Sequence, residues 1–112
     1  MLKIYRIFGQ EELDEWYCPI YPYEITEKDI FETIETDEIS EELIQNIKDV
    51  LFAEIKAKEV IDKYDEKNGW VTKLKYENPK EDWIEVSKKE NGNVEITFVS
   101  DFIMEGFVIV KT

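Results

Sequence analysis

The feature that most constrains the fold of this chain is a change in the spacing of its apolar residues at Asn68-Gly69. From Ser40 to this dipeptide, apolar residues recur every three or four positions, as on a helix with one apolar side. They are Leu43, Ile44, Ile47, Val50, Leu51, Ile55, Ile61 and Tyr64. From Trp70 onwards apolar and polar residues alternate, which is typical of a half-buried strand. We therefore expect one long helix, capped by Ser40 and ended by Asn68-Gly69, with strands after it.

Alternation also marks strands elsewhere in the chain. Residues 2–8 predict a first strand, on which Arg6 shares the apolar face and must reach a carboxylate or the sheet edge. Asn91-Gly92 predicts a two-residue hairpin turn between two further strands. The other expected strands lie over residues 70–77, around Ile84 and Val86, over 94–98, and over 102–111 with an interruption near Glu105-Gly106.

A capping signal predicts a second, short helix. Thr26 and Asp29 have the spacing of a capping box, and Ile30, Phe31 and Ile34 supply an apolar side after it. With the long helix and the strands, this element predicts a fold of the α+β class. The expected architecture is an antiparallel β-sheet of four to five strands packed against one long and one short α-helix.

Charge is distributed very unevenly along the chain. Segment 11–42 holds 13 of the 27 acidic residues and one basic residue, Lys28, so it carries −12 of the net charge of −13. Aromatic residues and isoleucines are interleaved with these carboxylates. We therefore expect the segment to fold into a single domain, residues 1–112, and not to form a disordered tail. A field this concentrated selects partners of opposite sign and argues against direct binding to nucleic acid or to anionic membranes.

The expected partner is thus a basic protein surface. Most of the aromatic residues between positions 16 and 23 should pack under the predicted short helix. One or two should stay exposed as interface anchors. Glu38 and Glu42, placed one helical turn apart, would be displaced by about 6 Å along the axis, of the same order as the phosphate spacing of nucleic acid. The predicted partner-binding residues are Glu11, Glu12, Asp14, Glu15, Trp16, Glu27, Glu32, Glu35, Asp37, Glu38, Glu41 and Glu42.

The sequence contains no motif for catalysis, for a cofactor or for a metal. The chain has no histidine, which removes the commonest general base and metal ligand, and its four glycines form no phosphate-binding loop. Cys18, the one cysteine, has no neighbouring cation to activate it, so we expect a buried, inert thiol. We also expect no membrane span and a reducing, cytoplasmic setting, which is the host cytoplasm if the protein is viral. The expectation is a protein that is not an enzyme and needs no cofactor.

These observations favour a small acidic inhibitor that occupies the basic nucleic-acid-binding surface of a larger enzyme. A folded row of carboxylates can act as a nucleic-acid mimic, as in phage or mobile-element proteins of the anti-CRISPR or anti-restriction type. An immunity protein that neutralises a basic toxin would use the same electrostatics. An adaptor or regulatory subunit would instead bind a protein surface unrelated to nucleic acid. Charge that serves solubility is the remaining interpretation, although acids spread along the chain would serve it equally well. The sequence leaves the oligomeric state open.

Overall fold

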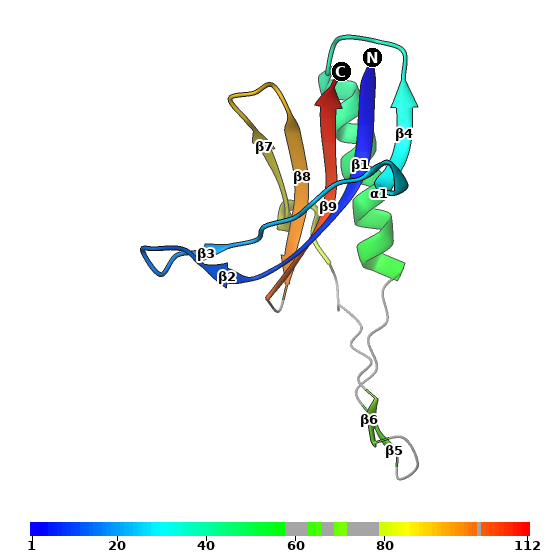
Figure 1. Cartoon of the computed structure of the whole chain (residues 1–112). Coiled ribbons are helices and arrows are strands. Elements are labelled where there is room, and N and C mark those ends of the chain that lie inside the picture. Colours follow the sequence, from blue (N-terminus) through cyan, green and yellow to red (C-terminus); the bar gives the residue numbers. More distant parts are fainter. Residues whose placement is uncertain (58–62, 66–68, 72–78, 101) are drawn as a thin grey trace.

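The computed structural model describes residues 1–57, 63–65, 69–71, 79–100 and 102–112. A five-stranded antiparallel sheet in the order β4-β1-β9-β8-β7 forms its centre, and helix α1 (Glu41–Ala57) lies across one face (Figure 1). The strands are β1 (Leu2–Gln10), β4 (Ile30–Ile34), β7 (Ile84–Lys88), β8 (Val94–Ser100) and β9 (Ile103–Lys111). The expected α+β class and antiparallel sheet are confirmed.

The first and last long strands of the chain, β1 and β9, pair in the middle of this sheet. Their register runs from Leu2↔Lys111 to Gln10↔Ile103, which brings the two chain ends side by side (Figure 1). In β9 the consecutive residues 107–109 are each at most 1% exposed. Because successive side chains of a strand point to opposite faces, both faces of the sheet must be covered here.

Gly106 marks a close approach of two strands and not a break in β9. It pairs with Ile7 of β1 and with Thr97 of β8, so the interruption expected near Glu105-Gly106 is wrong. A Cβ atom at Gly106 would lie 2.0 Å from the carbonyl oxygen of Ile96, and its φ of +158° is one that L side chains rarely adopt. The glycine therefore allows β8 and β9 to stay paired.

Helix α1 buries its apolar side on one face of the sheet. Its buried residues and those of the strands form one cluster, which includes Ile44, Ile47, Leu51 and Ile55 of α1 and Leu2, Ile4, Ile96, Phe107 and Ile109 of the sheet. The helix begins as predicted, because the Oγ atom of Ser40 accepts a hydrogen bond from the backbone N–H of Leu43 at 3.1 Å.

Arg6 reaches a carboxylate of the helix, as expected. Its guanidinium donates to both carboxylate oxygens of Glu54, at 3.1 and 2.5 Å. It also lies 5.2 Å from the ring centre of Phe31 and 5.0 Å from that of Phe107. This two-pronged ion pair over aromatic rings ties α1 to β1.

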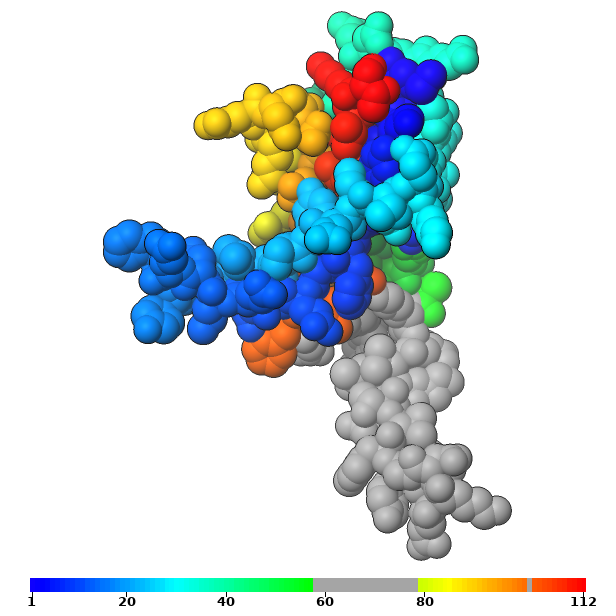
Figure 2. Space-filling model, viewed as in Figure 1, coloured from blue at the N-terminus to red at the C-terminus, as the bar shows by residue number. Residues whose placement is uncertain are grey.

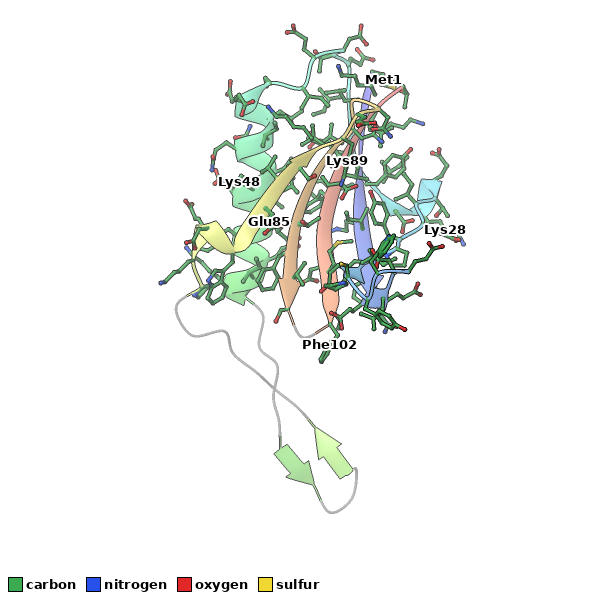
Figure 3. The ribbon with its side chains drawn as sticks, turned by 90° about the vertical axis from the view of Figure 1, so that its left-hand side faces the viewer. Met1, Lys28, Lys48, Glu85, Lys89 and Phe102 are labelled. Atoms are coloured by element: carbon green, nitrogen blue, oxygen red, sulfur yellow. The ribbon has the colours of Figure 1, made fainter. Side chains whose placement is uncertain are left out.

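The other face of the sheet is covered by the segment that leads into β4, so the molecule has three layers (Figure 3). Tyr21, Tyr23 and Ile30 of this segment pack against a cluster formed by Tyr5, Ile7, Met104 and Val108. The hydroxyl of Tyr23 donates to the Oε2 atom of Glu95 on β8 at 2.9 Å. Burial, and then this hydrogen bond, raise the pKa of Tyr23 above its usual range.

The predicted short helix is shorter than expected and is followed by a strand. The capping box of Thr26 and Asp29 is present, but it caps a 3-10 turn of three residues, η1 (Glu27–Asp29). The residues expected on the apolar side of that helix belong instead to β4, which pairs with β1. Ile30, Thr33 and Ile34 are β-branched and fit a sheet edge better than an isolated helix. The prediction of a second α-helix is therefore wrong.

The long helix ends earlier than predicted. The described part of α1 reaches Ala57, and Tyr64 already lies in strand β5 (Lys63–Asp65), opposite Trp70 of strand β6 (Gly69–Val71). Gly69 therefore begins a strand and does not end the helix. Pairing between these two strands competes with the helical spacing of the same residues. Ile61 and residues 72–77 of the predicted strand lie outside the described residues.

The hairpin predicted at Asn91-Gly92 joins β7 and β8, but through a longer loop than two residues. The backbone N–H of Lys89 donates to the carbonyl of Asn93 at 2.8 Å, and that of Gly92 donates to the carbonyl of Lys89 at 3.0 Å. Gly92 has a φ of +90°, the left-handed position that follows a tight turn in such loops. A second 3-10 turn, η2 (Glu81–Trp83), precedes β7.

Candidate protein-binding surface

A short hairpin projects from the sheet and carries five of the predicted partner-binding residues. Strands β2 (Glu12–Leu13) and β3 (Pro19–Ile20) pair antiparallel, and the hairpin stands out to one side of the molecule (Figures 1 and 2). We call residues 11–20 the acidic arm. Its base is attached to the sheet by the backbone N–H of Glu11, which donates to the carbonyl of Phe102 at 2.7 Å.

Asp14 organises the tip of the acidic arm. Its Oδ1 atom accepts hydrogen bonds from the backbone N–H groups of Trp16 at 2.8 Å and Cys18 at 2.9 Å. The backbone N–H of Tyr17 also donates to the carbonyl of Asp14, at 3.1 Å. An aspartate is suited to this because its short side chain can bond backbone groups two to four residues further on. Asp14, predicted to contact a partner, therefore also holds the turn that presents its neighbours.

The tip presents two aromatic side chains to solvent. Trp16 and Tyr17 are each 82% exposed, whereas Tyr21 and Tyr23 pack on the sheet. Two exposed rings agree with the expectation, but the other two pack on the sheet and not under a helix, so the predicted packing partner is wrong. Cys18 is exposed as well, so the prediction of a buried thiol is wrong. A turn closed by five residues has no interior in which a thiol could be buried.

Two aromatic residues at this end of the molecule hold a backbone conformation that is costly for them. Tyr17 has a φ of 59° and Phe102, at the base of the arm, a φ of 70°, and these are the non-glycine residues with positive φ in the described chain. Phe102 is 71% exposed. A positive φ costs an L residue roughly 1–2 kcal/mol, and exposed rings recover little of it by burial. Sequence reasoning missed Phe102, and it missed the positive φ of both residues, because neither Tyr nor Phe favours a left-handed backbone.

The carboxylates of the acidic arm make no ion pair with another described residue. Glu12 and Glu15 are exposed, and Glu11 is half-buried near Tyr21. Burial, and then the charge of Glu11, raise the pKa of the Tyr21 hydroxyl. The ion pairs of the described residues all lie elsewhere. The arm thus carries negative charge that the described chain does not neutralise.

The other predicted acids form a second group outside the arm, along η1, β4, the connection that follows β4 and the start of α1 (Figure 1). We call them the edge acids: Glu27, Glu32, Glu35, Asp37, Glu38, Glu41 and Glu42. Several of them are already paired within the chain. The pairs are Lys3–Glu27 at 3.6 Å, the Met1 ammonium–Asp37 at 2.6 Å and Lys88–Glu41 at 3.0 Å. The structure therefore separates the predicted site into an unpaired arm and a partly neutralised edge.

The helical row of carboxylates proposed from the sequence is not formed. Helix α1 begins at Glu41, after the Ser40 cap, so Glu38 precedes the helix and cannot lie one helical turn from Glu42. The Met1 ammonium, by its hydrogen bond, lowers the pKa of Asp37 in the same connection. Phosphate-like spacing on a helix is thus not a property of these acids.

Comparison with protein-family models, with curated proteins and with solved structures found no match for this chain. In the described residues, no group of three or more cysteine, aspartate or glutamate side chains is placed to hold a metal ion. No helix described here is long and apolar enough to cross a membrane. The acidic arm is the feature of the described surface that most resembles a binding site.

Proposed function

We propose that this protein is a non-enzymatic inhibitor that binds the basic, nucleic-acid-binding surface of a larger enzyme through its acidic arm. One observation carries the proposal: Trp16 is 82% exposed at the end of a projecting hairpin whose carboxylates make no ion pair with another described residue. An aromatic ring left in water amid negative charge adds little to the stability of its own chain. It suits an anchor that is buried when a cationic partner binds.

The rigidity of the tip supports the same role. Two hydrogen bonds to the Asp14 side chain and two between backbone groups define the turn from Asp14 to Cys18. A site that is ordered before binding loses less conformational entropy when the complex forms. The arm thus has the exposed aromatic anchor and the pre-organisation that are typical of interface hot spots.

The acidic arm and the edge acids differ in how they can contribute to binding. Three of the seven edge acids are paired with cations of the chain, and the partners in two of these pairs are well exposed. Such pairs contribute little stability, about 0–1 kcal/mol each, but they weaken the field that a partner meets. We assign contact to the acidic arm. Longer-range steering we assign to the edge acids that make no ion pair with another described residue: Glu32, Glu35, Glu38 and Glu42.

The chemistry of the arm favours a nucleic-acid-binding surface over other basic surfaces. Surfaces that bind nucleic acid combine clustered lysine and arginine with positions that receive bases. The carboxylates of the arm match the cations of such a surface, and the exposed aromatic rings match its base positions. A solubility role would require the charge but not the exposed rings.

Affinity capture followed by an inhibition assay tests this proposal. The full-length protein, immobilised at low salt, is exposed to an extract of the source organism, and captured proteins are eluted by raising the salt. We expect a captured protein that binds nucleic acid and loses this binding when one equivalent of the inhibitor is added. Trp16→Ala should abolish capture, whereas Phe8→Ala, which removes an exposed ring of β1, should not. A captured protein with no affinity for nucleic acid, eluting independently of salt, would instead indicate an adaptor.

A further inference from the structure

The acidic arm is narrow, which bears on the kind of nucleic-acid site it could enter. It is a ribbon of two strands with a five-residue tip, and neighbouring strands lie about 4.8 Å apart. In Figure 2 it stands away from the body of the molecule as a thin ridge. A ribbon of this width can enter a groove that is shaped for one polynucleotide strand.

The exposed aromatic rings also favour a groove for a single strand over a surface that binds a duplex. A duplex stacks its bases inside and presents phosphates outside, whereas a single strand presents both phosphates and the faces of unstacked bases. Trp16 and Tyr17 are each 82% exposed, and Glu12 and Glu15 of the same hairpin are exposed as well. The arm thus offers negative charges and free ring faces together, as a single strand does. The helical row of acids that would have matched a duplex backbone is absent, because Glu38 lies outside α1.

We infer that the acidic arm occupies a groove for single-stranded nucleic acid, with Trp16 and Tyr17 at positions where bases stack and with Glu12 and Glu15 where phosphates lie. This inference rests on the proposed function and names the class of partner. Single-strand grooves carry aromatic platforms on which successive bases stack. Trp16 should therefore bind by stacking its ring, a requirement that an aliphatic side chain of similar size does not meet.

Displacement from two DNA resins tests the inference with proteins defined by their chemistry. Proteins of the source organism are bound to single-stranded DNA resin and, in parallel, to duplex DNA resin, and the full-length protein is then applied to both. We expect it to release a protein from the single-stranded resin and not from the duplex resin. The concentration required should rise at least about tenfold for Trp16→Ala and for Trp16→Leu. Trp16→Phe, which keeps an aromatic ring, should stay within about threefold of the wild type.

Each other outcome has a defined meaning, because the side chain of Trp16 is exposed and its substitutions leave the core intact. Release from the duplex resin, alone or together with release from the single-stranded resin, would overturn the single-strand inference and leave the proposed function standing. Release from neither resin would overturn both. Full activity of Trp16→Leu would refute the stacking role and make Trp16 a simple apolar contact.

Discussion

Substituting each of the two glycines that have positive φ separates steric necessity from backbone strain. A Cβ atom at Gly106 would lie 2.0 Å from the Ile96 carbonyl oxygen and 2.9 Å from the Cα atom of Thr97, both in the backbone of the paired strand β8. Ordinary contacts are 3.4–4 Å, so β8 and β9 would have to separate at the centre of the sheet. Positive-φ strain of about 1–3 kcal/mol adds to this loss of pairing and packing. We expect Gly106→Ala to destabilise the protein by at least about 4 kcal/mol, or to prevent folding.

Gly92→Ala is the matched control, because it shares the left-handed backbone but not the crowding. Gly92 has a φ of +90°, and the nearest atom to a new Cβ would be the Cδ of Lys111 at 4.0 Å. This variant should lose only the conformational cost, about 1–2 kcal/mol. Urea-induced unfolding followed by tryptophan fluorescence measures both free energies. Equal losses for the two variants would refute the close approach of β8 and β9 as the reason for Gly106.

Two more predictions concern the buried side of α1 and the hydrogen bond by which Tyr23 attaches its segment to the other face of the sheet. Leu51→Ala should lower the free energy of unfolding by roughly 2–5 kcal/mol, since Leu51 is 2% exposed. Glu42 is exposed, so Glu42→Gln should cost only a few tenths of a kcal/mol, through the helix dipole. Equal urea midpoints for the two variants would contradict the buried face of α1. Tyr23→Phe should cost about 1–2 kcal/mol at pH 7 by removing the donor to Glu95. Because the folded state raises the pKa of Tyr23, its contribution is complete below about pH 10 and is lost as the pH rises towards the folded value. Unfolding measured between pH 8 and 11.5 should therefore show a steeper alkaline loss in the wild type than in Tyr23→Phe, and parallel curves would exclude this hydrogen bond as the cause.

Local signals in the sequence predicted where helical turns begin better than which secondary structure follows them. The Thr26 capping box and the Ser40 cap are both present, because a cap depends on residues a few positions apart. The chain after Thr26 continues as a strand because β1, more than twenty residues earlier, offers an edge for Ile30–Ile34. Helical spacing likewise failed at Tyr64, which lies in a strand that pairs with β6. In both places a pairing distant from the local pattern decides the structure.

The candidate site was predictable in its charge but not in its arrangement. The acids of segment 11–42 are visible in the sequence, yet their partition follows from distant cations such as Lys3 and Lys88, which pair with Glu27 and Glu41. Composition also cannot separate Trp16, at an exposed tip, from nearby aromatic residues that pack on the sheet. Which ring remains in solvent depends on where the hairpin leaves the sheet, and this is a tertiary property.

The most direct test of the account measures the association rate of the captured partner against ionic strength. Two matched double variants, Glu12→Lys with Glu15→Lys in the arm and Glu32→Lys with Glu35→Lys among the edge acids, change the net charge equally. As the Debye length falls from about 30 Å at 0.01 M to about 8 Å at 0.15 M salt, the wild-type rate should fall steeply. The arm variant should dissociate much faster and lose stable binding, whereas the edge variant should associate more slowly and with a weaker salt dependence but keep a similar dissociation rate. Equal effects of the two variants, or a rate indifferent to salt, would contradict recognition through the acidic arm.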